Sequence, residues 1–163
     1  MQSINFQEKK LKHLLITILL LAPFFTYANE SQQIDKLAKP ILDLFSKNEI
    51  EHVASKALEH SSVSDYISKA DLIQTDSQFH GYLNVLGKFY SLQLIHQQGI
   101  EGTYSTRWYV LKYQRQPALI SLEFYKADDE WEVHSINLKL ELDDYLEERS
   151  KIEIGKLGIK KEN

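Results

Sequence analysis

Residues 104–140 read YSTRWYVLKYQRQPALISLEFYKADDEWEVHSINLKL, and this stretch decides the predicted fold. It contains three segments rich in aromatic and β-branched residues, as strands usually are. These segments are residues 104–114, 118–126 and 131–140. The short connections at 115–117 and 127–130 join antiparallel neighbours as hairpins. Residues 89–97 predict a further strand before them, so the sequence predicts a four-stranded antiparallel meander.

The chain before these strands has the period of helices, with apolar residues three and four positions apart. The first stripe is Ile34, Leu37, Ala38, Ile41, Leu42 and Phe45, and the second is Ile50, Val53, Ala54, Ala57 and Leu58. Pro40 predicts a kink or break near Lys39. Asp76 is expected to cap a third helix that ends at Gly87. Helices followed by strands predict an α+β domain, with helices on one face of a curved sheet.

The N-terminal segment has the features of an export signal. A basic stretch at 8–13 precedes twelve residues, Leu14–Phe25, that are apolar except for Thr17. As a helix they would span only about 18 Å, which is short of a bilayer core. Small residues at the −3 and −1 positions predict cleavage after Ala28. We therefore expect an exported protein, periplasmic or secreted, without stable membrane insertion after cleavage.

The predicted domain division is a signal peptide at 1–28, one domain at 29–149 and a charged, loosely held tail at 150–163. The first 28 residues hold three Lys and one Glu, so the remainder keeps 16 Lys and Arg against 22 Asp and Glu, a formal charge of −6. Acidic character without a basic run argues against nucleic acid as a partner. The chain has no Cys, which excludes a lipid-modified N-terminal Cys, disulfides and thiolate metal sites.

The order of elements resembles the cystatin-like α+β roll, in particular the small secreted NTF2-like proteins without assigned activity. Residues 79–89 look like the end of the third helix and the start of the first long strand of that group. Residues 120–133 look like its last hairpin, in which an acidic turn precedes a Trp. The resemblance covers about residues 31–140 and contains no catalytic motif. It implies a hydrophobic pocket between helices and sheet and dimerisation through the outer sheet face, without implying one activity.

Alternation along the strands predicts two faces of the sheet. We assign to the helix-packed core Trp108, Val110, Ile120, Leu122, Phe124, Trp131 and Val133. The opposite set is Arg107, Tyr109, Leu111, Tyr113, Leu119, Ser121, Glu123, Tyr125, His134, Ile136 and Leu138. This second face is aromatic and carries polar groups, so it is the predicted site of function.

Two interpretations of the second face stay open. If the protein is an enzyme, Glu123 and His134 would act as acid and base, with Arg107 stabilising an anion. Aromatic residues interspersed with Arg are also typical of protein interfaces. The predicted interface residues are Tyr109, Tyr113 and Tyr125. Which interpretation holds depends on the face that the helices cover.

The pocket that the resemblance implies would be lined by Tyr82, Leu86, Trp108 and Phe124. We expect no metal and no cofactor, because His52 and His60 on the second helix are best read as a solvated face and no motif for either is present. The sequence thus favours an exported NTF2-like accessory domain that binds a small apolar ligand or a protein partner without catalysis. The alternatives are a cofactor-free pocket enzyme of isomerase or dehydratase type and a structural module that forms a homodimer through the sheet face.

Overall fold

The computed structural model describes residues 30–143, 145–147 and 149. The predicted signal peptide and the predicted tail lie outside these residues. The chain divides into a unit of residues 1–36 and a unit of residues 37–163. The described part of the first unit, 30–36, is helical, and the same helix continues to residue 47.

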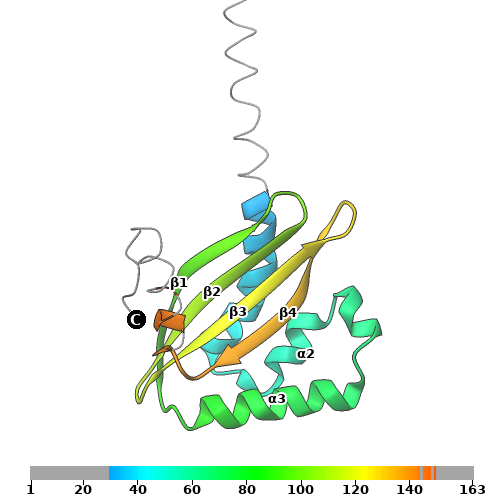
Figure 1. The fold of residues 1–163 in the computed structure, drawn as a ribbon. Coiled ribbons are helices and arrows are strands. Elements are labelled where there is room, and N and C mark those ends of the chain that lie inside the picture. The colour runs from blue at the N-terminus through cyan, green and yellow to red at the C-terminus, as the bar shows by residue number, and fades with distance from the viewer. Residues whose placement is uncertain (1–29, 144, 148, 150–163) are drawn as a thin grey trace, which may run out of the picture. The chain divides into compact units, whose positions relative to one another are not determined.

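Helices precede a four-stranded antiparallel sheet, which confirms the α+β class and the predicted order of elements (Figure 1). After the first helix come η1 (Ile50–His52), α2 (Val53–Leu58), η2 (Ser62–Asp65), α3 (Lys69–Asn84), β1 (Phe89–Ile100), β2 (Tyr104–Tyr113), β3 (Pro117–Lys126) and β4 (Trp131–Lys139). The strands neighbour one another in sequence order, as a meander. Residues 37–47 of the first helix lie behind the sheet in Figure 1.

The break expected near Lys39 is wrong, because the first helix continues through Pro40. A proline inside a helix removes one backbone hydrogen bond and crowds the preceding turn. Here Ala38, Ile41 and Phe45 are buried on one side of the helix and keep it in register across the proline. An ion pair of 2.8 Å between Lys39 Nζ and Asp43 Oδ2 also spans Pro40 on the surface. Side-chain packing therefore outweighs the local cost of the proline.

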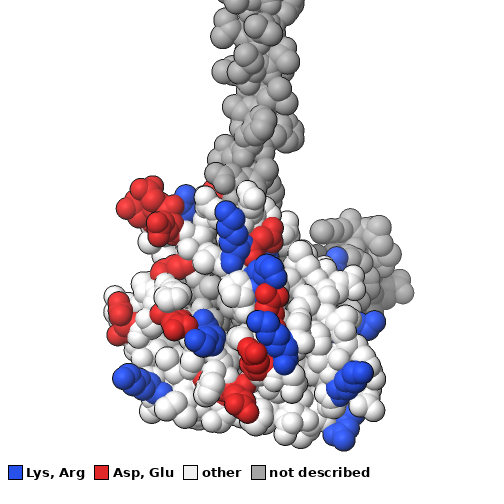
Figure 2. Space-filling view, turned by 180° about the vertical axis from the view of Figure 1, so that it is seen from behind, with Lys and Arg blue, Asp and Glu red and all other residues white. Residues whose placement is uncertain are grey.

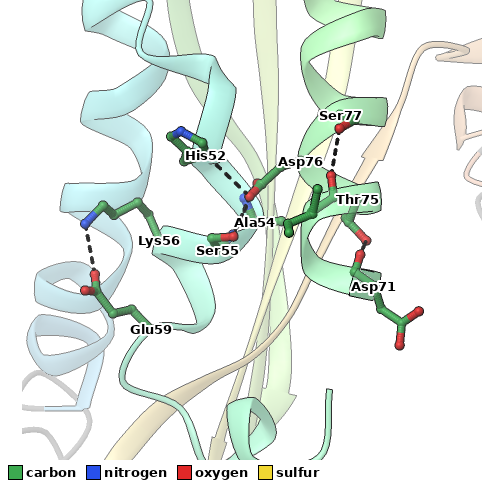
Figure 3. A network of polar contacts seen from close by, with 10 residues as sticks. His52, Ala54, Ser55, Lys56, Glu59, Asp71, Thr75, Asp76 and Ser77 are labelled. Carbon is green, nitrogen blue, oxygen red and sulfur yellow. Dashed lines mark hydrogen bonds and ion pairs between the residues drawn. The ribbon is translucent and has the colours of Figure 1, made fainter. Parts of the chain in front are cut away.

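The sequence suggested that Asp76 caps the third helix. This is wrong, because α3 begins two turns earlier, behind Ser68. Its buried carboxylate instead accepts hydrogen bonds at the start of α2 (Figure 3). The Ala54 N–H donates to Oδ1 at 2.8 Å and the Ser55 N–H at 3.2 Å, while the Ser55 hydroxyl donates to Oδ2. His52, which precedes α2, makes no side-chain cap. Asp76 therefore supplies from α3 the cap that α2 lacks, and joins the two helices.

A second polar contact fixes η2 to the sheet. Glu132, on β4, accepts hydrogen bonds from the Ser62 N–H at 2.8 Å and from the Ser62 hydroxyl. Residues of α2 and of η2 contact β4. One edge of the sheet is therefore covered by helical segments.

The contact between Ser62 and Glu132 makes the free energy of unfolding depend on pH in the acidic range. The hydroxyl and then the N–H of Ser62 lower the pKa of Glu132 from its ordinary value of 4.5. A lowered folded pKa means that the contact stabilises above about pH 4.5 and is lost as the pH falls below it. We expect Glu132→Gln to lose less stability than the parent between pH 5 and pH 3 in urea titrations. Glu130→Gln, in the adjacent turn, should follow the parent, and equal acid sensitivity of both variants would contradict the assignment.

The register of β2 against β3 corrects the predicted faces. Lys112 pairs with Pro117, so an even number of residues connects them, and odd-numbered residues of β2 stand opposite even-numbered residues of β3. Arg107 thus pairs with Leu122, whereas Trp108 pairs with Ser121. The predicted core set had combined Trp108 and Val110 with the even-numbered residues of β3, which is wrong by one residue in β2. A shift of one residue exchanges the two faces of a strand.

We call the two sides of the sheet the inner and the outer face. The inner face, which packs into the core, carries Arg107, Tyr109, Leu111 and Tyr113 of β2 with Ala118, Ile120, Leu122 and Phe124 of β3. The outer face carries Tyr104, Thr106, Trp108 and Val110 of β2 with Leu119, Ser121, Glu123 and Tyr125 of β3. Phe45, Val53 and Leu83 of the helices are also almost fully buried, as expected of the helical side of one core.

Tyr113 carries a buried hydroxyl into this core. Its ring packs edge-on against Phe89 with centroids 5.4 Å apart, and the hydroxyl has no hydrogen-bond partner within the described residues. Burial raises the pKa of Tyr113 to about 12. Phenolate is thus disfavoured in the folded state, and the raised pKa favours folding below pH 10 but loses that effect as the pH rises from about 10 to 12.

We expect Tyr113→Phe to keep the ring packing and to leave stability at pH 7 unchanged or raised by about 1 kcal/mol, because an unpartnered buried hydroxyl costs free energy. Its stability should fall less than that of the parent between pH 10 and 12 in denaturant titrations. Tyr66→Phe, at a side chain that is 88% exposed, is the control and should change neither quantity. A loss above about 1 kcal/mol at pH 7 would show that the hydroxyl has a stabilising role.

Candidate functional site

The outer face of the sheet holds a group of aromatic and ionisable side chains that does not belong to the core. It lies toward the viewer in Figure 1, on the side opposite to residues 37–47 of the first helix. Tyr104 and Trp108 lie four residues apart on this face of β2, and Tyr125 of β3 stands opposite Tyr104. We call these three residues the aromatic band.

Glu123 and His134 complete the band at one end. The Tyr104 hydroxyl donates to Glu123 Oε2 at 2.7 Å. His134 is the extra residue of a bulge in β4, between Val133 and Ser135, which pair with Phe124 and Glu123. Its ring centroid lies 6.4 Å from that of Tyr104 and 5.8 Å from that of Tyr125. The bulge therefore places an exposed imidazole between two tyrosine rings.

The electrostatics of this end favour a neutral phenol. Burial, followed by the hydrogen bond to Glu123, raises the pKa of Tyr104. A tyrosine that stays protonated donates to the carboxylate, so one acceptor position of Glu123 is already occupied. The pair is a fixed polar group within an aromatic surface.

The other end of the band continues onto β1. His96 pairs with Trp108 across the strands, and their ring centroids lie 5.2 Å apart. Thr106, between Tyr104 and Trp108 on the same face, is buried. The outer face thus presents aromatic rings flanked by imidazoles rather than a row of charges.

Charged side chains are prominent on the opposite side of the molecule. Seen from behind, Lys and Arg are interspersed with Asp and Glu among the described residues (Figure 2). Surface pairs such as Lys56 Nζ to Glu59 Oε2, at 3.2 Å, are of this mixed kind. Interspersed signs of charge give a solvated surface without a strong field of either sign.

Comparison of the chain with family models, curated proteins and solved structures found no match. Among the described residues, no group of three His, Cys, Asp or Glu side chains could hold a metal ion. The described part of the chain also contains no helix long and apolar enough to cross a membrane.

The predicted catalytic group does not assemble. Arg107 lies on the inner face and is 3% exposed, while Glu123 lies on the outer face and His134 is exposed beside it. The sheet separates the guanidinium from the carboxylate and the imidazole. Only Glu123 and His134 remain on one surface, where Tyr104 and Tyr125 lie around the imidazole.

The predicted ligand-binding residues are also divided. Phe124 is 0% exposed on the inner face, and Trp108 lies on the outer face of the same sheet. Leu86 is buried after the end of α3, and Tyr82 of α3 is half exposed. These four side chains therefore do not line one pocket.

Of the predicted interface residues, only Tyr125 lies on the outer face. Tyr109 and Tyr113 are buried on the inner face, because β2 is shifted by one residue from the predicted register. The same shift brings Tyr104 and Trp108 to the outer face. Sequence reasoning missed Tyr104 as a site residue, because the predicted three-residue connection at 115–117 did not show that four residues separate the paired Lys112 and Pro117.

Proposed function

We propose that this protein is an exported, non-catalytic domain of the NTF2-like type, and that it binds a protein partner through the outer face of its sheet. The observation that carries the proposal is the aromatic band of Tyr104, Trp108 and Tyr125 on the face opposite to residues 37–47 of the first helix (Figure 1). Aromatic residues are enriched where proteins bind one another, because they contribute large contact areas and few rotamers. The signal-like segment before Asn29 supports export.

A protein partner accounts for this surface better than a small apolar ligand. A ligand pocket needs side chains that converge on one cavity. The four side chains predicted to line one lie on both faces of the sheet, on α3 and just after its end. The outer face instead carries Tyr104 opposite Tyr125, with Trp108 four residues further along β2, so its rings are spread over the surface and do not converge on one point.

The same geometry disfavours an acid–base enzyme. Glu123 accepts a hydrogen bond from Tyr104, and His134 stands among aromatic rings on the outer face. Arg107, the group that would stabilise an anion, is on the other side of the sheet. The remaining residues are typical of a recognition surface, because Glu123 offers a polar contact and aromatic rings surround it.

Photo-crosslinking tests the proposed surface. A benzophenone amino acid replaces Trp108 or Tyr125 in the full chain, expressed in cells that export it, and Tyr66 serves as the control because it is aromatic, 88% exposed and outside the sheet. We expect adducts with one other protein from positions 108 and 125 and not from position 66. Adducts of two copies of the chain would favour the sheet-face homodimer instead. Equal labelling from all three positions, or none, would contradict the proposal.

The intact mass of the recovered protein tests export separately. Cleavage after Ala28 predicts a chain that begins at Asn29. Recovery of the uncleaved chain from the cytoplasm alone would contradict the export proposal and leave the surface proposal to be judged by crosslinking.

A further inference from the structure

The two edges of the sheet differ in how they are covered. At β4, α2 and η2 contact the strand, and Glu132 binds Ser62. At the other edge, no strand among the described residues pairs with the free side of β1. Every second residue of such an edge directs its N–H and C=O groups away from the sheet, where they are able to pair with another strand.

The sequence of β1 does not protect this edge. Natural edge strands are usually short or carry charges and prolines that prevent pairing. β1 has twelve residues, FYSLQLIHQQGI, without Lys, Arg, Asp, Glu or Pro. Three of its large apolar side chains, Tyr90, Leu94 and Ile100, are exposed, and Ile100 is 67% exposed. A long, uncharged and partly apolar edge is suited to strand pairing.

Bulges limit where pairing is regular. The register against β2 shifts at Tyr90 and again at Ile95, and from His96 to Ile100 it is continuous. Gly99 lies within this run, where a Cβ would be only 2.1 Å from the Tyr104 carbonyl oxygen. The close approach of the two backbones at Gly99 keeps the run tightly paired to β2. Gln98 lies at its centre and is exposed.

We propose that the partner of this edge is a second copy of the chain, paired antiparallel through His96–Ile100 about a two-fold axis near Gln98. In such a symmetric contact, Gln98 faces Gln98 of the other copy, so a charge at this position would stand opposite its own copy. β1 carries no Lys, Arg, Asp or Glu, and its one histidine, His96, would stand opposite Ile100 of the other copy and not opposite itself, hence no such repulsion arises at the axis. A glutamine amide has both donors and an acceptor, so two Gln98 side chains are complementary to each other.

The pairing would form one continuous sheet from two sheets of four strands. A two-fold axis perpendicular to the sheet leaves both outer faces on the same side. Two copies of the aromatic band would then be available to a partner, and binding would gain from effective concentration. The inference does not depend on the proposed function, because the edge and the outer face are separate surfaces with separate tests.

Matched charge substitutions at Gln98 test the pairing. Sedimentation equilibrium of the protein recovered from full-chain expression gives the dimer dissociation constant. We expect Gln98→Lys and Gln98→Glu each to weaken the dimer about two- to fivefold, because like charges stand opposite each other. An equimolar mixture of the two variants should form a heterodimer at least as tight as the parent dimer.

Gln78→Lys on the exposed side of α3 is the control. The chain is acidic, with a net charge of −4, so one added Lys reduces the general repulsion between copies equally at positions 78 and 98. Only the variant at position 98 should weaken the dimer, and more so at low salt. Gln98 is exposed, and unchanged urea midpoints of all variants show that folding is intact.

Three results would overturn the proposal. The first is a parent protein that stays monomeric at high concentration. The second is a Gln98→Lys variant that dimerises as tightly as the parent, and the third is a mixture of the two charged variants that fails to restore dimerisation. A monomer that dimerises once residues 150–163 are removed would assign the edge to that segment and not to a second copy.

Discussion

Replacing Asp76 by Ala is expected to lower the free energy of unfolding by about 3 kcal/mol. The buried carboxylate accepts hydrogen bonds from the Ala54 N–H, the Ser55 N–H and the Ser55 hydroxyl, and it is an anion at a helix N-terminus. Loss of a cap alone costs about 1 kcal/mol, and the backbone donors left behind without a partner cost a further 1–3 kcal/mol. The loss should appear as a lower urea midpoint at pH 7.

Two matched variants separate this contact from the general effect of removing an acid. Asp43→Ala removes an exposed carboxylate that is paired with Lys39, and should cost no more than about 0.5 kcal/mol. Ser55→Ala removes one of the three donors and should cost about 1 kcal/mol. If Asp76→Ala cost no more than Asp43→Ala, Asp76 would not cap α2.

The neighbouring residues Phe124 and Tyr125 should differ in their effect on stability by several kcal/mol. Phe124 is 0% exposed on the inner face, whereas Tyr125 is 37% exposed on the outer face of the same strand. Removing a buried Phe side chain leaves a cavity and costs about 3–5 kcal/mol. We expect Phe124→Ala to show this loss, and Tyr125→Ala to lose about 1 kcal/mol.

Binding of the partner should depend on Tyr125 more than on Phe124, which is the opposite of their order of effect on stability. Tyr125→Ala is expected to reduce crosslinking from the probe at position 108, because it removes part of the aromatic band. Phe124→Leu keeps most of the core volume and should leave that crosslinking unchanged. Similar stability losses for both alanine variants would contradict the assignment of the two faces.

The strands were predictable because their signal is local. Each predicted strand overlaps the observed one, and its ends differ by three residues or fewer. Aromatic and β-branched residues alternate within each segment, and Gly, Pro and Asp residues mark the connections. The stripe Ile50, Val53, Ala54, Ala57 and Leu58 likewise became the buried side of η1 and α2.

The function of Asp76 was not predictable from local sequence. An Asp before an apolar stripe indicates a cap of the helix that follows it, and Ser68 provides that cap here. The residues that donate hydrogen bonds to Asp76 at the start of α2 lie 21 and 22 positions away in the sequence. Only the packing of α3 against α2 brings the carboxylate to Ala54 and Ser55.

The candidate site was missed in part because β2 has apolar residues on both faces. Tyr109 and Leu111 alternate with Trp108 and Val110, so hydrophobicity does not decide which pair is buried. The connection after Lys112 decides it, since its even length sets the register with β3. Arg107 and Trp108 therefore lie on the faces opposite to those predicted, and the predicted group of Arg107, Glu123 and His134 is divided between the two faces.

Cysteine protection at two adjacent residues of β2 tests this register most directly. The chain has no Cys, so Val110→Cys and Leu111→Cys each carry a single thiol. Leu111 is fully buried on the inner face, and Val110 is partly exposed on the outer face. Under native conditions the thiol at position 110 should react with a disulfide reagent at least about 100-fold faster than the thiol at 111, which reacts only through opening of the core. Equal rates, or a faster reaction at position 111, would return Trp108 and Val110 to the core and contradict the outer face described above.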